Sequence, residues 1–237
     1  SYRGYCKDFG PTDLAGVVSF CRKVRVMLQD PRRLGRPAVY CTASNSTWIS
    51  ETLANVAFLF GAYLVLVKGK SPEDAAAPFS RIQPSPFKAF RDATHLESDF
   101  DLSLLDCLRG LERGARAGFF DLETFDVEQF NRDDALGLSV MCPKFVAFKG
   151  PVSGRDRPSY ALEPEEFLDR FQELGVSDVV RLNEASTYHS EVFVEAGMRH
   201  HEMHFPDCSV PPLEIALQFL EARISCQGVI AVHCLAG

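Results

Sequence analysis

The sequence predicts an α/β fold built from two similar units, in which parallel strands are joined by helices. Short β-branched runs alternate along the chain with longer segments of helical periodicity, as expected when helices connect parallel strands. Residues 38–44 and 231–237 share Ala, Val, Cys and Ala at identical offsets, which indicates a repeated strand-and-loop unit. At 237 residues, 46% of them hydrophobic, the chain has room for two small domains.

In the first unit, the repeat is expected to begin with a strand that ends at Cys41, and two helices are expected to follow it. Residues 53–65 are apolar with helical spacing, so we expect a buried helix there. Ser71 and Pro72 are typical of a helix start, because serine caps the first turn and proline fits its first position. A further helix is predicted over 103–117.

The second unit is expected to contain four strands and two helices around the second copy of the repeat. The expected helices are 163–174, which has a proline at its start and is followed by a glycine, and 212–225. The expected strands are 145–148, 178–182, 199–205 and 229–232.

The predicted boundaries follow from an acidic stretch between the two units. Residues 125–134 are rich in acidic side chains and are suited to a connecting helix. We therefore predict a first unit over 1–120, a linker helix region over 121–139 and a second, incomplete unit over 140–237.

The last residues carry the clearest chemical signal. The run 229–232 leads into His233, Cys234 and, three residues later, Gly237, which is the order in which a cysteine-phosphatase loop begins. Such a loop needs a thiolate nucleophile and backbone N–H groups that hold a phosphate dianion. Small residues such as Ala236 and Gly237 let those amides approach the phosphate oxygens. The alternative is that Cys234 is a buried core cysteine at a strand end.

The arginine that completes this signature would stand six residues after Cys234, beyond Gly237. We therefore expect the sequence to stop within the catalytic loop, and the 237-residue chain by itself to be inactive. The corresponding position of the first copy is Thr47, so we expect the first unit to be structural rather than catalytic.

Composition argues against several classes of function. The net charge of −7 argues against a nucleic-acid partner. The longest apolar run, 56–67, is too short to span a membrane. The eight cysteines lack paired metal spacing and no signal peptide is visible, so we expect reduced thiols, no metal, no cofactor, and a location in nucleus and cytoplasm.

Several longer motifs show a resemblance to one family. The chain resembles the Cdc-fourteen (Cdc14) family of dual-specificity protein phosphatases, the mitotic-exit phosphatases. The motifs that carry the resemblance are residues 55–63, 90–93, 145–151, 180–183 and 228–234. The resemblance implies two phosphatase-like domains in tandem, joined by a linker helix, of which only the second is catalytic.

The resemblance also implies a mechanism. Cys234 matches the nucleophile, which forms a phosphocysteine intermediate, and Asp207 matches the general acid that protonates the leaving oxygen. The other matched residues of the phosphate loop are His233, Leu235, Ala236 and Gly237.

The implied partners are phosphoproteins, with no nucleic acid and no membrane. The resemblance predicts phosphoserine or phosphothreonine followed by proline with a basic residue nearby, and phosphotyrosine, as in the reversal of cyclin-dependent kinase phosphorylation in cell-cycle control. An acidic groove would read the basic residue, and its candidates are Glu128, Asp133 and Asp134. The alternative for this acidic run is a solvated surface.

The chain departs from the family pattern at three positions. Leu235 stands where the family usually has lysine, and Cys208 stands where it has glycine after the acid. Asn131 falls on a position that is acidic in the family, which makes the substrate preference less secure than the reaction type.

Other readings of these residues remain open. Asp207 could be an ordinary turn residue in a proline-rich loop. A zinc site could use His200, His201, His204 and Cys208, but adjacent strand histidines point to opposite faces. A non-catalytic phosphopeptide-binding module is the main alternative function. A lipid or RNA 5′-phosphatase is another, and the acidic charge counts against it.

Overall fold

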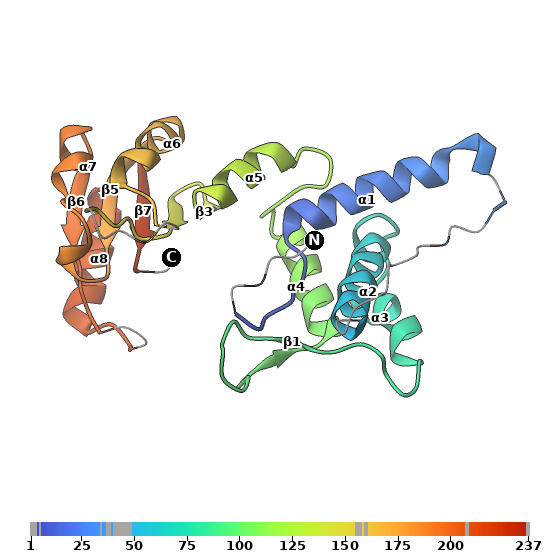
Figure 1. Ribbon diagram of the computed structural model, residues 1–237. Helices are drawn as coiled ribbons and strands as arrows, with labels where there is room; N and C mark the ends of the chain where they lie inside the picture. Colours follow the sequence, from blue (N-terminus) through green and yellow to red (C-terminus); the bar gives the residue numbers. More distant parts are fainter. Residues whose placement is uncertain are drawn as a thin grey trace. The chain divides into compact units, whose positions relative to one another are not determined.

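The computed structural model describes residues 4, 6–33, 35, 36, 39, 49–154, 158, 161–206 and 209–235. The chain divides into two compact units, Ser1–Val127 and Glu128–Gly237. Within the described residues, no helix is long and apolar enough to cross a membrane. Both units are drawn in Figure 1.

The described part of the first unit is mostly helical. Its predicted helices are confirmed, because the segments expected over 53–65, from Ser71, and over 103–117 form α2, α3 and α4. The elements are α1 (Leu14–Gln29), the 3₁₀ turn η1 (Pro31–Arg33), α2 (Ile49–Leu66), α3 (Pro72–Ser80), β1 (Phe90–Arg91), β2 (Asp101–Leu102) and α4 (Leu104–Arg116).

Side-chain caps start three of these helices. Asp13 accepts a hydrogen bond from the backbone of Gly16 at 2.7 Å at the start of α1. Ser71 caps α3, and Ser103 forms a capping box with Asp106 at α4. Each cap satisfies backbone N–H groups that the helix leaves unpaired, which fixes where the helix begins.

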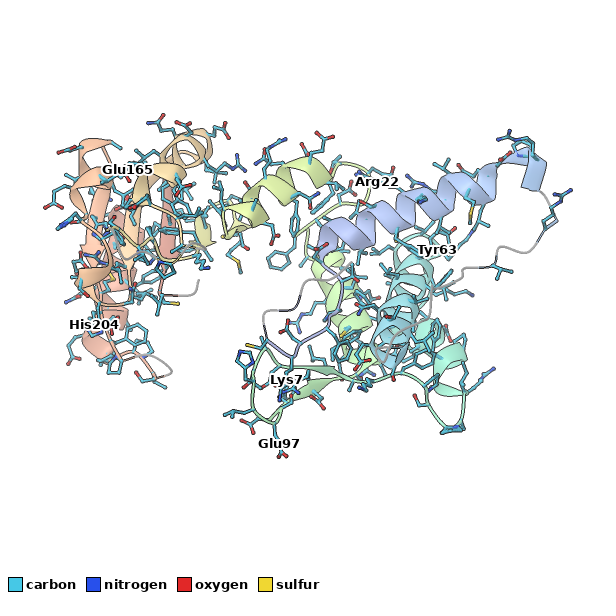
Figure 2. All side chains as sticks on the ribbon, in the orientation of Figure 1. Lys7, Arg22, Tyr63, Glu97, Glu165 and His204 are labelled. Carbon is cyan, nitrogen blue, oxygen red and sulfur yellow. The ribbon has the colours of Figure 1, made fainter. Side chains whose placement is uncertain are left out.

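The helices of the first unit pack around one apolar core. Gly61 of α2 lets Leu108 of α4 approach closely, because a Cβ at position 61 would lie 2.8 Å from a Leu108 methyl carbon. Arg22 of α1 donates to the carbonyl oxygens of three residues after α4 at 2.8–3.1 Å (Figure 2). Those acceptors are Leu122, Glu123 and Phe125.

The expected parallel sheet of the first unit is not seen among the described residues. The only strands there are β1 and β2, an antiparallel pair of two residues each. The strand predicted to end at Cys41, the first copy of the repeat and Thr47 all lie outside the described residues. The tandem arrangement of two phosphatase-like domains therefore stays a prediction.

The second unit is a mixed α/β domain around a five-stranded sheet of order β3-β4-β7-β5-β6 (Figure 1). Strands β4, β7, β5 and β6 are parallel, and β3 is an antiparallel edge strand. The strands are β3 (Leu138–Cys142), β4 (Phe145–Phe148), β5 (Val176–Arg181), β6 (Arg199–Glu202) and β7 (Val229–His233). The helices are α5 (Val127–Ala135), α6 (Leu168–Leu174), α7 (Glu191–Glu195) and α8 (Leu213–Ser225), with 3₁₀ turns η2 (Pro164–Phe167) and η3 (Ala185–Thr187).

The six elements predicted for this unit are confirmed with small shifts of boundary. The helix predicted over 163–174 is the 3₁₀ turn η2 continued by α6, which ends at Gly175 in the left-handed conformation. Two elements were not predicted, β3 and α7. β3 has one buried residue and three exposed ones, and α7 has only five residues, so neither has a distinct hydrophobic period.

The sheet has a buried cluster on each face. Val179 and Ala231 belong to a cluster that includes phenylalanines from β4, η2, α6 and α7. Their neighbours Val180 and Ile230 point to the other face, where they pack with Ala222 of α8. Because β7 is covered on both faces, its end is a fixed position in the fold.

Candidate active site

The end of β7 lies at the centre of the second unit's sheet. Its last residue, His233, pairs with Arg181 of β5, and the backbone N–H of Leu182 donates to the carbonyl of His233 at 2.9 Å. Cys234 comes next and is partly exposed, and Leu235 is 56% exposed. In open parallel sheets, binding sites form at the carboxyl ends of the strands. The fold places Cys234 at such a position.

The side chain of His233 is folded against the backbone of its neighbour. The ring is buried, and its Nδ1 lies 2.8 Å from the carbonyl oxygen of Cys234. A carbonyl oxygen can only accept, so Nδ1 carries a hydrogen in this contact. The ring also packs against Phe148 of β4, with 4.6 Å between centroids.

A tyrosine joins this histidine to a second one. The hydroxyl oxygen of Tyr188 lies 2.8 Å from Nε2 of His233 and 2.8 Å from Nε2 of His200 on β6. Burial raises the pKa of Tyr188 above its ordinary value, so the hydroxyl keeps its hydrogen. All three side chains are buried, and their hydrogen bonds form one chain that ends at the carbonyl of Cys234.

The direction of the hydrogens in this chain follows from the charge of the rings. Burial lowers the pKa of His233 to about 4 and that of His200 to about 4, so both are neutral near pH 7. With its hydrogen on Nδ1, His233 accepts at Nε2 from the hydroxyl of Tyr188. The hydroxyl has a single hydrogen, so its contact with Nε2 of His200 is a hydrogen bond only if that nitrogen donates.

A buried arginine, Arg181, contacts both Tyr188 and Glu202. The Arg181 guanidinium donates through Nε to Glu202 at 2.8 Å and makes a second contact with the same carboxylate through Nη2. Its Nη1 donates to the backbone carbonyl of Tyr188 at 2.8 Å, and it stacks over the tyrosine ring at 4.3 Å. Glu202 also lies 3.2 Å from Nδ1 of His200. Tyr188 is thus held at both its backbone and its ring.

Comparison with known proteins finds relatives along the whole chain. A model for the N-terminal half of dual specificity protein phosphatases matches residues 1–114. Human dual specificity protein phosphatase CDC14A is 35% identical over 242 residues, which cover 100% of this chain and 40% of the human protein. Caenorhabditis elegans tyrosine-protein phosphatase cdc-14 is 32% identical over 243 residues, and the match covers 100% of this chain and 34% of the worm protein.

The chain is thus similar over its whole length to proteins named Cdc14 phosphatases. It spans about 40% of the length of the human Cdc14 relative. Among solved structures, Tk-PTP in the active form aligns with 43% of this chain and 63% of its own chain, with a TM-score of 0.32 and 19% identity.

The predicted site residues are only partly described. His233, Cys234 and Leu235 are described at the end of β7, whereas Ala236, Gly237 and the predicted acid Asp207 lie outside the described residues. The roles of all six as site residues stay predictions.

The histidines considered for zinc have other partners. His200 contacts Tyr188, whereas His201 points to the opposite face and lies 2.8 Å from the buried carboxylate of Asp178. Burial opposes ionisation of Asp178, but hydrogen bonds from Ser177, His201, Cys226 and Arg199 outweigh it and lower its pKa to about 2. In the part of the chain that the structure describes, no three His, Cys, Asp or Glu side chains could hold a metal ion.

The three acidic candidates on α5 differ in exposure. Glu128 and Asp134 of α5 are exposed, but Asp133 is 7% exposed. Its carboxylate accepts two hydrogen bonds from Arg170 of α6, at 2.7 and 2.9 Å, and one from Gln129 at 2.8 Å. Asp133 is therefore paired with Arg170 within its own unit. The two exposed carboxylates, Glu128 and Asp134, are the candidates that could bind a basic residue of the substrate.

The buried histidines make stability dependent on pH. A histidine whose pKa is about 4 when folded and about 6.5 when unfolded opposes folding as the pH falls from 6.5 to 4, because only the unfolded chain binds the proton. Each of the two contributes roughly 3 kcal/mol over this range. We expect hydrogen exchange of the β5 and β7 amides to show this loss of stability.

Single-histidine variants test this expectation. Replacing His200 by asparagine should reduce the slope of stability against pH between 6.5 and 4 by about half. The variant His95→Gln, at an exposed position of the first unit, is the matched control and should leave the slope in the second unit unchanged. An equal slope for His200→Asn and the unmutated protein would contradict the expectation.

Proposed function

We propose that the protein containing this chain is a cysteine-dependent protein phosphatase with Cys234 as its nucleophile. The observation that carries this proposal is the position of Cys234 after the central parallel strand, with its carbonyl bound by buried His233. The family relatives, which are named dual specificity and tyrosine-protein phosphatases, support it.

The proposed reaction has two steps. The Cys234 thiolate attacks the phosphorus, and the bond to the serine, threonine or tyrosine oxygen breaks while Asp207 gives that oxygen its proton. The phosphocysteine formed is then attacked by water, whose proton returns to Asp207. Inorganic phosphate leaves and the thiolate is restored.

The proposed substrates are phosphoproteins with phosphoserine or phosphothreonine before proline, and a basic residue nearby. Glu128 and Asp134 support this proposal because they are exposed on α5 in the same unit as Cys234. By the same family resemblance we propose a role in cell-cycle control, reversing phosphorylation by cyclin-dependent kinases in nucleus and cytoplasm.

A panel of phosphopeptides tests this function in the full-length protein. We expect turnover of peptides with phosphoserine-proline, faster when lysine or arginine follows than when alanine does. The double variant Glu128→Gln, Asp134→Asn should reduce that preference a few-fold, since exposed charge pairs contribute only ~0.2–1 kcal/mol each, and the effect should shrink as salt is added.

The control variant removes two acidic charges from the first unit instead. Glu97 and Asp99 are exposed acids on a loop of the first unit, and Glu97→Gln, Asp99→Asn should leave the preference unchanged (Figure 2). No turnover of any phosphopeptide would contradict the proposed activity and favour a phosphopeptide-binding module. Turnover without a basic preference would remove only the acidic surface from the proposal.

A further inference from the structure

A glycine just after the neighbouring strand β4 leaves room for the backbone that follows β7. Gly150 lies two residues after the end of β4, is buried, and has no left-handed backbone angle that would require glycine. A Cβ at this position would come closer than 3.0 Å to the carbonyl oxygen of Cys234. It would also lie 3.1 Å from Nδ1 of His233 and 3.2 Å from the carbonyl oxygen of Leu235. Glycine is therefore needed here for space.

The carbonyl oxygen of Cys234 is also held by a side chain. Nδ1–H of His233 donates to it, and the hydroxyl of Tyr188 holds the other nitrogen of that ring. Because neutral His233 carries its hydrogen on Nδ1, its Nε2 accepts the single hydroxyl hydrogen of Tyr188. The orientation of one backbone carbonyl is thus fixed by His233 of β7, Tyr188 before α7 and Gly150 after β4.

Fixing this carbonyl also fixes the next backbone N–H. The peptide unit between Cys234 and Leu235 is planar, and in the trans form its C=O and N–H point in opposite directions. With the carbonyl directed at His233 and Gly150, the N–H of Leu235 is directed away from them. It is the first donor after the Cys234 thiol that a phosphate could meet.

We propose that Gly150 and Tyr188 are positioning residues that orient the Cys234–Leu235 peptide, so that the N–H of Leu235 donates to the phosphate of the substrate. The proposal rests on the proposed phosphatase function. Backbone donors aimed in advance at a developing negative charge are worth most when nothing needs to rotate during the reaction. Neither residue touches the substrate, and both act through the backbone of Cys234.

The test compares two glycines in the full-length protein. Gly150→Ala should raise the inhibition constant of inorganic phosphate about tenfold or more, a part of the ~10²–10³-fold effect of removing such a donor. Selective ¹⁵N labelling of leucine should show the Leu235 amide shifting with phosphate in the unmutated protein and not in Gly150→Ala. Tyr188→Phe should change both readouts in the same direction.

Gly228→Ala separates positioning from general damage. A Cβ at Gly228, before the other end of β7, would crowd the carbonyl of Gly175 in the same way. This variant should lose comparable stability yet keep the Leu235 response and the affinity for phosphate. Wild-type phosphate affinity and an unchanged Leu235 shift in Gly150→Ala would overturn the proposal.

A second readout does not depend on phosphate. The ¹⁵N shifts of His233 should report a hydrogen on Nδ1 in the unmutated protein, and Tyr188→Phe should shift Nε2, which loses its donor. If this pattern is found but phosphate does not bind, the proposed function fails while the backbone arrangement stands. A His233 ring with its hydrogen on Nε2 would overturn the arrangement itself.

Discussion

Cys234→Ser is expected to abolish turnover while leaving phosphopeptide binding in place. The proposed nucleophile is a thiolate, and a serine hydroxyl is not ionised at neutral pH, so the variant lacks a nucleophile. We expect a loss on the order of 10⁴-fold or more in kcat for every substrate. The backbone carbonyl of residue 234 can still accept from His233, so binding should survive.

Cys142 offers a matched control for this variant. It ends β3, is partly exposed like Cys234, and carries a free thiol. Cys142→Ser should therefore keep full turnover, as measured by phosphate release from phosphotyrosine and phosphoserine peptides. Substantial activity in Cys234→Ser, or equal losses in both variants, would assign the nucleophile elsewhere.

Asp207→Ala is expected to slow phosphoserine peptides strongly and to spare aryl phosphates. An alkoxide is a poor leaving group, so a general acid contributes ~10²–10⁴-fold to its departure. A nitrophenolate leaves without that help, so turnover of p-nitrophenyl phosphate should fall much less. The ratio of kcat/KM for the two substrates is the measurement.

A second carboxylate checks that the effect belongs to Asp207. Glu184 follows β5, is exposed, and lies 3.7 Å from His204. Glu184→Gln should leave the ratio between phosphoserine and aryl phosphate unchanged. Equal losses on both substrates in Asp207→Ala would make that residue part of folding or binding rather than of proton transfer.

The sequence predicts those parts of the fold that have a distinct local pattern. The β-branched run of β7 and the Ser71–Pro72 start of α3 are read directly from residue types. β3 was missed because an edge strand with one buried residue lacks a hydrophobic face. Its pairing with β4 depends on residues outside the strand itself.

The candidate site is predicted less completely, because its contacts depend on register. Tyr188 reaches His200 and His233 only because β6 and β7 lie on either side of β5, and no local pattern marks it. The need for glycine at position 150 comes from the backbone of a strand far along the chain. The acidic run of sequence predicts an exposed carboxylate at Asp133. Its ion pair with Arg170 depends on how α5 packs against α6, which the residue spacing does not indicate.

The central claim is that Cys234 carries the phosphate during turnover. The most direct measurement is to mix the full-length protein with a phosphopeptide, quench the reaction within one turnover, and map the phosphate by mass spectrometry. We expect phosphate on the peptide that contains Cys234, located on its sulfur, and none in Cys234→Ser. Phosphate on another residue, or none during rapid turnover, would contradict it.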